Sequence, residues 1–319
     1  MPPIVTAFVL GAGLGARLRP ITHRLPKPLV PVLNRPLITH TFDRLIDAGV
    51  RRFVVNTHHL PAAYAAAFPG AVHRGCPIHF QHEPLLLDTG GGLRNSAHLL
   101  TAPFLLANGD IYSDLPTGPL LSAHADCGGI ATLALRSNGP VRNVAVAAGE
   151  GKPGSVRVTD LRGLLDPACV GTHQYTGIAV IDPALLDRIP PGEVRSLIPV
   201  LAEAIRDGLV VGGVVLDAGE WFDLGTAAEY LAVHARLCAG RWVIASDVAV
   251  DPDASISGFG AIGAGVTVAG GAHLRNVVAW SDGGPLRIGP GARLADCVVF
   301  GAGTFGSANS GPVVEVTSR

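Results

Sequence analysis

The sequence has 319 residues, of which 48% are hydrophobic and 15% are charged, and its formal net charge is -1 at pH 7. This composition excludes a disordered chain and a coiled coil, and the length suits one large α/β domain followed by a smaller one. The balanced charge leaves no surplus of cations for nucleic acid or an anionic membrane, so we expect small-molecule partners. Lys27 and Lys152 are the only lysines among 24 basic residues, which makes each lysine informative.

The cysteine spacing and the lack of export signals predict a cytoplasmic protein. No basic segment precedes the apolar start at 4–15, so no signal peptide is expected, and no apolar stretch is long enough to span a bilayer. The five cysteines are scattered singly without a CxxC pair. This spacing predicts reduced thiols rather than disulfides or a zinc site.

Short apolar runs alternate with amphipathic stretches up to about residue 240. The strand candidates are Ile4–Leu10, Arg52–Asn56, Phe104–Ala107, Ile130–Leu135 and Ile178–Ile181. Leu37–Ala48 and Leu197–Asp207 carry apolar residues at helical spacing and are predicted helices. Residues 1–240 are therefore predicted to form a Rossmann-like α/β domain, with a mostly parallel sheet covered by helices on both faces.

A different period begins after Arg241. Large aliphatic residues recur every six positions, at Ile244, Val250, Ile256, Ile262, Val268 and Leu274. The phase is lost across Trp280–Pro285 and resumes at Ile288, Leu294 and Phe300. Such a period is typical of hexapeptide repeats, which build a parallel β-helix with the large side chain inside, whereas an irregular sheet would show a period of two. Residues 241–319 are therefore predicted to form a β-helix domain, whose flat faces and open end favour a homo-oligomer.

A glycine-rich loop follows the first predicted strand, at the edge where open α/β sheets bind their ligands. Gly11, Gly13 and Gly15 stand at alternate positions, so the loop matches neither the dinucleotide fingerprint nor a Walker loop. Glycines there let backbone amides approach phosphate oxygens without interference from a Cβ atom. Arg17 follows directly and Lys27 lies between two prolines, so the segment suits a triphosphate, while a plain turn with solvated cations is the alternative.

Motifs spread over the chain support one interpretation of this loop. They are the segments 10–22, 26–38 and 83–92, the turn Asn108-Gly109-Asp110, the turn Tyr175-Thr176-Gly177-Ile178, and the segment 221–226. Together they resemble the motifs of the sugar-1-phosphate nucleotidylyltransferases, also called NDP-sugar pyrophosphorylases. A C-terminal left-handed β-helix is also common in that family, so the resemblance covers nearly the whole chain.

The resemblance implies a Mg²⁺-dependent enzyme that transfers a nucleotidyl group from an NTP to a sugar 1-phosphate and releases pyrophosphate. Arg17 would bind the β- and γ-phosphates, and Lys27 the α-phosphate and the incoming phosphate. Asp110 and Asp223 would hold Mg²⁺, which prefers oxygen ligands, and Asp110 is expected at the same sheet edge as the glycine loop. Taken alone, Asp110 also suits a plain turn and Asp223 a helix cap. No general base is needed, because the sugar phosphate is largely dianionic at pH 7.

The resemblance also implies which residues contact the substrates. The nucleotide would contact Leu10, Gly11, Ala12, Gly13, Gly15, Arg17, Lys27, Glu83, Thr89, Gly90 and Asn108. Glu83 and the amides after Thr89 would read the base, and a carboxylate suits the imino N–H of uracil, thymine or guanine. Asn143, Thr176 and Gly177 would contact the sugar phosphate, although Thr176 and Gly177 also suit a simple turn into a strand.

The sugar end departs from the family pattern. The usual Glu-Lys-Pro segment before the sugar-binding turn is missing, and the stretch Val158–Pro167 offers Arg162 instead. This departure leaves the sugar open, and we expect a hexose or amino-hexose 1-phosphate used with UTP, GTP or dTTP. Asn56, His58 and His59 end the second predicted strand, but no acid lies at ligand spacing to complete a metal site with the histidines.

Two other functions fit parts of the sequence. A regulatory or scaffold relative would keep the fold and bind a nucleotide or sugar nucleotide without turnover, but the four charged positions that the chemistry needs are all present. A hexapeptide acyltransferase also carries such repeats, but the repeat segment is short and its only histidine is His273. We therefore predict a nucleotidyltransferase.

Overall fold

The computed structural model describes residues 3–149, 154–309 and 311–317, so Lys152 lies outside the described residues. The chain divides into two compact units. Unit 1 comprises Met1–Gly13 and Ile38–Trp221, and unit 2 comprises Leu14–Leu37 and Phe222–Arg319. The loop that carries Arg17 and Lys27 thus groups with the C-terminal segment, whereas the predicted domain boundary at residue 240 stays a prediction.

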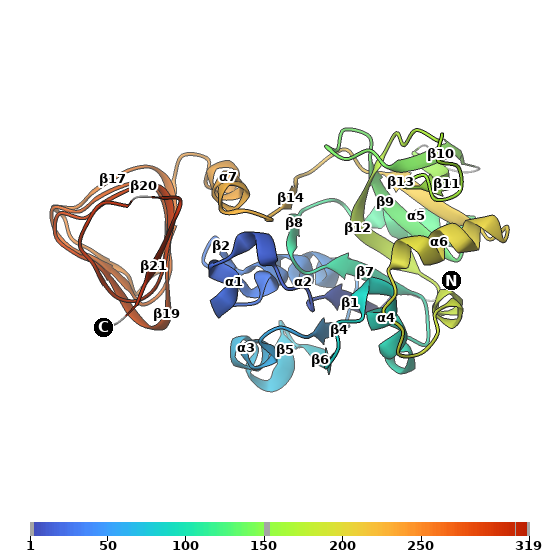
Figure 1. The fold of residues 1–319 in the computed structure, drawn as a ribbon, viewed down its shortest axis with the longest axis horizontal. Helices are drawn as coiled ribbons and strands as arrows, with labels where there is room; N and C mark the ends of the chain where they lie inside the picture. Colours follow the sequence, from blue (N-terminus) through green and yellow to red (C-terminus); the bar gives the residue numbers. More distant parts are fainter. Residues whose placement is uncertain (1–2, 150–153, 310, 318–319) are drawn as a thin grey trace. The chain divides into compact units, whose positions relative to one another are not determined.

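A ten-stranded sheet forms the centre of unit 1, in the order β10-β11-β13-β9-β12-β7-β1-β4-β6-β5 (Figure 1). Its strands are β1 (Thr6–Leu10), β4 (Arg52–Thr57), β5 (Val72–His73), β6 (Cys76–His82), β7 (Phe104–Asn108), β9 (Ala131–Arg136), β10 (Val144–Ala148), β11 (Ser155–Leu161), β12 (Gln174–Ile181) and β13 (Val211–Val215). β1 pairs in parallel with β4 and β7, and β4 pairs in parallel with β6. β12 lies antiparallel between β7 and β9. This mixed sheet with a parallel centre confirms the predicted α/β architecture.

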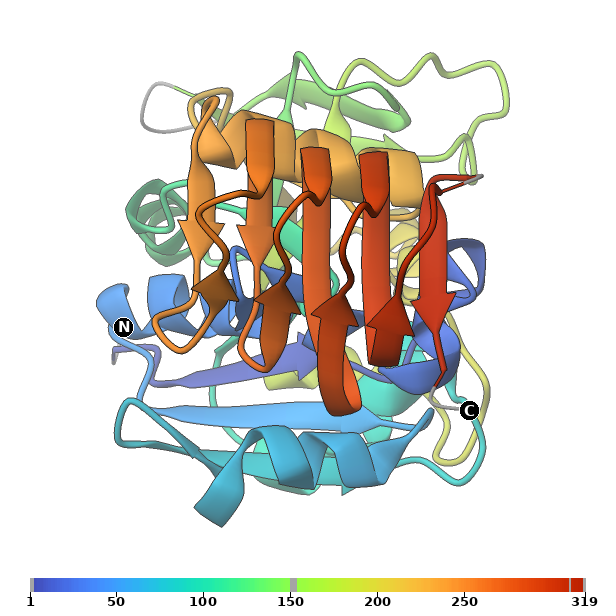
Figure 2. The ribbon, with the colours of Figure 1, turned by 90° about the vertical axis from the view of Figure 1, so that its left-hand side faces the viewer.

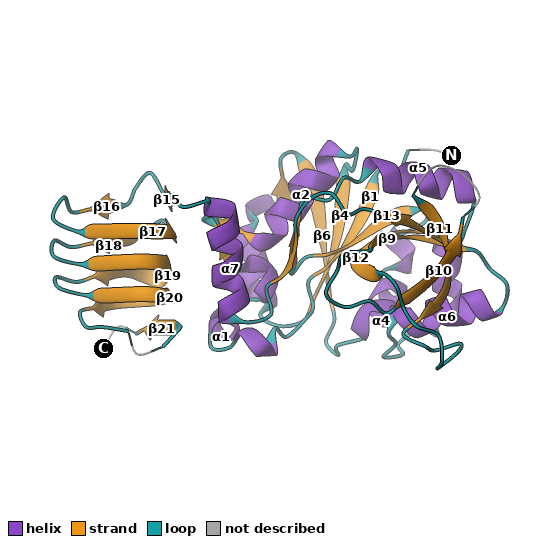
Figure 3. Ribbon diagram, turned by 90° about the horizontal axis from the view of Figure 1, so that it is seen from above, coloured by secondary structure: helices purple, strands orange, loops and turns teal. Residues whose placement is uncertain are grey.

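Helices cover both faces of this sheet, with α4 and α6 on one side and α2 and α5 on the other (Figure 3). The helices are α2 (Leu37–Asp47), α3 (Pro61–Ala67), α4 (Asp88–Asn95), α5 (Gly118–Cys127) and α6 (Leu197–Arg206). Leu93 of α4 and Leu201 of α6 belong to one buried apolar cluster with Phe8 of β1. On the other face, the ring centroids of Phe42 on α2 and Phe53 on β4 are 4.4 Å apart. The periodic apolar faces of α2 and α6 therefore form helices as predicted.

The C-terminal strands of unit 2 curl into a parallel β-helix. They are β15 (Trp242–Ile244), β16 (Ala249–Val250), β17 (Ser255–Ile262), β18 (Val266–Val268), β19 (His273–Ile288), β20 (Arg293–Phe305) and β21 (Val313–Val316), and every pairing between them is parallel. Figure 2 shows successive coils stacked side by side from orange to red. The interior contains Ile262, Val268, Leu274, Ile288 and Leu294 of the six-residue series. Unit 2 also contains α1 (Ile21–Arg24), α7 (Ala227–Cys238), β2 (Pro31–Val32) and β3 (Arg35–Pro36).

The six-residue register shifts by one position before Trp280, where the sequence predicts the loss of phase. Ile262 pairs with Ala279 rather than Trp280, because the strand register shifts between Ser257 and Gly260. The prediction that Phe300 points into the helix interior is therefore wrong. Its ring stacks on Trp280, with centroids 5.0 Å apart, and neither ring belongs to the interior cluster.

The five cysteines are all free thiols. No helix among the described residues has the length and apolar character needed to span a membrane.

Candidate functional site

The first half of the glycine loop is bound tightly to its neighbours in unit 1. The Gly11 amide donates to Oδ1 of Asn56 at 2.9 Å, and the Gly11 carbonyl accepts a hydrogen bond from the Tyr64 hydroxyl at 2.7 Å. A Cβ atom on residue 11 would lie 2.7 Å from the Asn56 carbonyl oxygen, so only glycine fits here. Burial, with a smaller contribution from the charge of Asp110, raises the pKa of Tyr64 far above its usual range, which keeps this hydroxyl a donor. A Cβ on Gly13, in contrast, would meet no atom within 4 Å.

The turn after β7 brings Asp110 to the end of β1. The Gly109 amide donates to the Leu10 carbonyl at 2.9 Å, and a Cβ on residue 109 would lie 2.6 Å from that oxygen. This contact places the Asn108-Gly109-Asp110 turn beside the start of the glycine loop. The carboxyl ends of β1 and β7 therefore meet at one sheet edge, where the sequence places them.

Glu83 connects two loops from inside the protein. Its side chain is fully buried, and Oε1 accepts a hydrogen bond from Nδ2 of Asn56 at 2.8 Å. Its other oxygen, Oε2, accepts from the Leu87 amide at 3.2 Å. Both carboxylate oxygens are thus engaged within the chain, which makes Glu83 a positioning residue for the glycine loop and for the segment before α4. The structure lends no support to the prediction that Glu83 contacts the base directly.

The glycines after Thr89 pack closely against the backbone that precedes α6. A Cβ on Gly90 would lie 2.7 Å from the Arg195 carbonyl oxygen, and one on Gly91 would lie 2.4 Å from the Glu193 carbonyl oxygen. The Gly91 amide also donates to the Arg195 carbonyl at 3.0 Å. The amide of Gly91 is therefore already occupied, and the role of Thr89 and Gly90 toward a base stays a prediction.

The predicted sugar-binding turn is built against the Asn-Gly-Asp turn. Gly177 has φ +81°, and a Cβ there would lie 2.7 Å from Cγ of Asn108, so both backbone and space require glycine. Oγ1 of Thr176 donates to the Ala134 carbonyl at 2.9 Å, and the Thr176 carbonyl accepts from Nε1 of Trp221 at 2.9 Å. The structure therefore brings Asn108, Thr176 and Gly177 together at one end of the sheet.

An ion cluster in unit 2 joins the segment before α7 to the second half of the glycine loop. Nζ of Lys27 lies 2.7 Å from Oδ1 of Asp223, and Nη2 of Arg17 lies 3.0 Å from Oδ2. Lys27 is almost fully buried, whereas the Arg17 side chain is 65% exposed. Burial alone would raise the pKa of Asp223, but the hydrogen bonds and charges of Lys27 and Arg17 outweigh it and lower this pKa below its usual range. Asp223 is therefore ionised at neutral pH.

Two glycines shape this cluster. Gly15 has φ +59°, and its carbonyl accepts a hydrogen bond from Oγ1 of Thr22 at 2.9 Å, which turns the chain toward Lys27. A Cβ on Gly225 would lie 2.5 Å from Nη1 of Arg17. Three of the predicted site residues, Arg17, Lys27 and Asp223, are thus brought together within unit 2.

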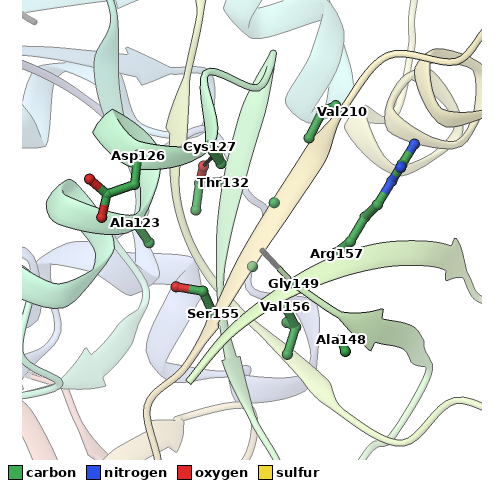
Figure 4. Close-up of a pocket in the computed structure, with 12 residues that line it drawn as sticks. Ala123, Asp126, Cys127, Thr132, Ala148, Gly149, Ser155, Val156, Arg157 and Val210 are labelled. Carbon is green, nitrogen blue, oxygen red and sulfur yellow. Dashed lines mark hydrogen bonds between the residues drawn. The ribbon is translucent and has the colours of Figure 1, made fainter. Parts of the chain in front are cut away.

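A further cavity of unit 1, about 280 Å³ in volume, opens between α5 and the strands β9, β11 and β13 (Figure 4). Sγ of Cys127 lies 3.3 Å from Oγ1 of Thr132 on its wall. Gly212 and Gly213 leave the space open, because a Cβ on residue 212 would lie 3.0 Å from the Cys127 sulfur. None of the predicted site residues lines this cavity.

Within the described ranges, no three side chains of His, Cys, Asp or Glu cluster in the manner of a closed metal site. A Mg²⁺ ion bound with phosphates needs only one or two carboxylates from the protein, because phosphate and water oxygens complete its shell. The carboxylates of Asp110 and Asp223 have the oxygen chemistry for this role, and an ion at Asp223 would share its oxygens with Lys27 and Arg17.

Comparison with known proteins assigns the family. A profile described as nucleotidyl transferase matches residues 6–160. N-acetylmuramate alpha-1-phosphate uridylyltransferase of Neisseria meningitidis is 31% identical over 246 residues, which cover 74% of this chain and 99% of that protein. This chain belongs to the nucleotidyl transferase family. Mannose-1-phosphate guanylyltransferase of Mycobacterium tuberculosis is 29% identical to this chain over 311 residues, which cover 93% of this chain and 80% of that protein.

Solved structures share the fold of the nucleotidyl transferase. A UTP-bound UGPase from Acinetobacter baumannii matches with a TM-score of 0.60 at 18% identity, over 72% of this chain and 92% of that chain. The inositol-1-phosphate CTP transferase from T. maritima matches with a TM-score of 0.59 at 20% identity, over 75% of this chain and 98% of that chain.

Sequence reasoning missed one residue of this region, Tyr64. It lies on α3 and is the one polar aromatic residue of the alanine-rich segment Pro61–Ala67, but the sequence does not say that its partner is the glycine loop. Its hydroxyl bond to Gly11 spans 53 positions of the chain. A search for a polar aromatic in an otherwise small-residue helix could have singled it out.

Proposed function

We propose that this nucleotidyl transferase moves a nucleotidyl group from an NTP to a sugar 1-phosphate. In this reaction a phosphate oxygen of the sugar 1-phosphate attacks the α-phosphorus of the NTP. The bond from the α-phosphorus to the bridging oxygen breaks, and pyrophosphate leaves. The observation that carries the proposal is the pair of cations, Lys27 and Arg17, fixed on Asp223 beside the glycine loop.

The chemistry requires two anions to approach each other, so its main demand is charge neutralisation in a fixed geometry. Lys27 meets this demand because its ammonium is held in place, nearly buried, by the 2.7 Å contact to Asp223. Arg17 is exposed at the same carboxylate and offers a planar fork of donors that matches phosphate oxygens. We assign Lys27 to the α-phosphate and the attacking phosphate, and Arg17 to the leaving pyrophosphate.

Asp110 and Asp223 would each offer a carboxylate to a Mg²⁺ ion that is bound with the phosphates. When bound, the ion supplies positive charge to the phosphate oxygens of the triphosphate. The glycine loop, Leu10 to Gly13 with Gly15, and Asn108 would hold the nucleotide. Thr176, Gly177 and Asn143 would hold the sugar phosphate. We place the reaction in the cytoplasm. We also propose that the protein is a homo-oligomer whose subunits associate through the β-helix.

Pyrophosphate release measured with Mg²⁺, over a grid of nucleoside triphosphates and sugar 1-phosphates, tests this function. We expect release that requires both partners, and Lys27→Ala should lower kcat about 100- to 1,000-fold, as for the loss of one charge-stabilising donor. The control is Arg24→Ala, because Arg24 makes an exposed ion pair with Glu315 outside the proposed machinery and should leave kcat unchanged. Nucleotide binding without turnover over the whole grid would contradict the proposal and favour a regulatory relative.

A further inference from the structure

The segment that carries Lys27 continues into a tight hairpin of unit 2. β2 (Pro31–Val32) pairs antiparallel with β3 (Arg35–Pro36), and Leu33 and Asn34 form the two-residue turn between them. Both turn residues lie in the left-handed region, with φ +52° and +63°. Asparagine tolerates this region, but leucine rarely adopts it, so contacts from outside the hairpin have to hold the turn.

Helix α7 supplies two of these contacts. The Tyr230 hydroxyl donates to the Pro31 carbonyl, and the Leu33 amide donates to Nε2 of His234 at 3.2 Å. Nδ1 of His234 lies 2.9 Å from the Tyr230 carbonyl oxygen, which can only accept. The imidazole is therefore the tautomer with its proton on Nδ1, and its other nitrogen accepts from the hairpin. Tyr230 and His234 are both fully buried, so water does not compete for these bonds.

Asn34 connects the hairpin to the β-helix. Its Nδ2 donates to the Val243 carbonyl at 3.0 Å and to the Ile262 carbonyl at 2.9 Å. Val243 lies on β15 and Ile262 on β17, and these two strands are parallel neighbours in successive coils. One carboxamide thus contacts two coils with both of its N–H groups. We call these bonds of Asn34, together with those of Tyr230 and His234, the hairpin anchor.

The hairpin anchor bears on the position of Lys27. The Val30 amide donates to the Lys27 carbonyl at 3.1 Å, and the Leu37 amide donates to the Val30 carbonyl at 3.1 Å. Hydrogen bonds therefore connect Lys27 to both ends of the hairpin. Asp223, whose Oδ1 lies 2.7 Å from the Lys27 ammonium, comes just before α7 begins at Ala227. Helix α7 thus acts on Lys27 in two ways, through the Asp223 carboxylate and through the hairpin.

We propose that the β-helix and α7 position the reacting groups, and that Asn34 and His234 are positioning residues that hold the Lys27 ammonium in its catalytic place. The proposal rests on the proposed function for the role of Lys27, and it gives the C-terminal domain a part in catalysis besides self-association. Asn34 and His234 act through the hairpin backbone rather than on the substrates. Because the reaction brings two anions together, a small displacement of the ammonium weakens the stabilisation of the transition state.

Chemical labelling of lysine tests this proposal without turnover. The sequence has two lysines, Lys27 and Lys152, so limited acetylation followed by peptide mass spectrometry can measure Lys27 with Lys152 as the reference. Asn34→Gly removes the carboxamide and keeps the turn, because glycine adopts a positive φ freely. We expect labelling of Lys27 relative to Lys152 to rise roughly 10-fold, since the buried ammonium becomes accessible more often when its loop is held less firmly.

Asn309 offers a matched control. Its Nδ2 also donates to two carbonyls of the β-helix, those of Ala295 at 3.1 Å and Gly311 at 3.0 Å, but these bonds do not involve the hairpin. Asn309→Gly should therefore leave the labelling of Lys27 unchanged. His234→Phe should raise the labelling as Asn34→Gly does, and His234→Gln should recover part of the effect, because it keeps an acceptor. An equal rise in Asn309→Gly would overturn the proposal.

A double-mutant cycle tests whether the hairpin anchor acts through Lys27. We expect Asn34→Gly to lower kcat about 10-fold with little change in KM, as for a displaced group that serves the transition state. In a Lys27→Ala background the same substitution should cause no further loss. A merely structural role would lower the urea midpoint of Asn34→Gly and leave kcat and Lys27 labelling as in wild type. That result, or equal losses of kcat in both backgrounds, would overturn the proposal.

The two measurements separate this proposal from the proposed function. In a wild-type protein that released no pyrophosphate, the proposed function would fail. Labelling of Lys27 that rises in Asn34→Gly and not in Asn309→Gly would still support the hairpin anchor. Turnover in the wild type with equal labelling of Lys27 in every variant would instead keep the proposed function and reject the hairpin anchor.

Discussion

The buried pair of Asn56 and Glu83 offers a sharp test of how the glycine loop is held. Asn56→Ala removes the acceptor of the Gly11 amide, at 2.9 Å, and a donor to Oε1 of Glu83, at 2.8 Å. Asn56 is 2% exposed and Glu83 is 0% exposed, so water cannot replace either bond. Each orphaned group costs about 1–3 kcal/mol, and the carboxylate lies at the upper end, so we expect a loss of about 4 kcal/mol in the free energy of unfolding.

A pair of isosteric substitutions isolates the network from the cavity that alanine leaves. Asn56→Asp sets two carboxylates against each other, and Glu83→Gln leaves one acceptor oxygen for two donors, the Asn56 amide and the Leu87 amide. Each single variant should therefore lose stability. The double variant, Asn56→Asp with Glu83→Gln, satisfies every group again, since the introduced amide donates to the introduced carboxylate and its oxygen accepts from Leu87.

Urea unfolding followed by circular dichroism measures these four chains, wild type included, at pH 7.5. We expect the double variant to recover at least half of the summed losses of the singles, which is a coupling of roughly 2 kcal/mol. Activity should follow the same order, because both loops depend on the pair. Losses in the double variant that equal the sum of the single losses would refute the network as the support of the glycine loop.

Three further predictions concern other positions. Gly177→Ala should lower the free energy of unfolding by about 2 kcal/mol and also lower kcat, because residue 177 has φ +81° and its new Cβ would lie 2.7 Å from the Asn108 side chain. Thermal unfolding and steady-state kinetics measure the two effects. A neutral substitution would contradict the close packing of the two turns. Asp223→Asn should tighten pyrophosphate binding in the presence of EDTA, because the substitution removes the anionic partner of Lys27 and Arg17. Turnover should fall, since the proposed metal site loses a carboxylate. Titration calorimetry that finds weaker or equal pyrophosphate binding would reject this reasoning. Burial lowers the pKa of His124, partly opposed by Asp182, so the folded state binds fewer protons than the unfolded state. The free energy of unfolding should therefore fall as the pH drops below about 6.5, the ordinary histidine pKa, toward the lower pKa of His124 in the folded state. His124→Gln should make the free energy of unfolding depend less on pH. Urea midpoints measured from pH 7.5 to 5.5 check this.

Local patterns in the sequence predicted the elements that depend on local physics. The apolar face of Leu37–Ala48 requires only neighbours along one helix, and the structure has α2 at Leu37–Asp47. The six-residue series predicted the β-helix interior from Ile262 to Leu274 for the same reason. It failed at Phe300, because a one-residue shortening of a coil near Asn276 shifts the register, whereas the spacing alone places the loss of phase at Trp280–Pro285.

Long-range partnerships were outside the reach of such patterns. Lys27 and Asp223 lie 196 positions apart, and only a resemblance to a family, not spacing, suggested both. Strand β13 contains Gly212 and Gly213, which are poor strand formers, so its place in the sheet is decided by the neighbours β9 and β11 rather than by propensity. The burial of Glu83 was also beyond such patterns, since a carboxylate in a sequence gives no sign of whether it is buried or open to a ligand.

A buried carboxylate such as Glu83 is a weak source of stability, because the cost of removing its charge from water offsets most of the gain from its hydrogen bonds. A pair of well-packed apolar side chains could hold the same space at similar free energy. Such a pair would not fix where the neighbouring backbone amides lie, whereas Glu83 with Asn56 sets the amides of Gly11 and Leu87 by direct bonds of 2.8 to 3.2 Å. The geometry therefore favours position over stability as the reason for this carboxylate, and it predicts that apolar replacement of both residues costs more activity than stability.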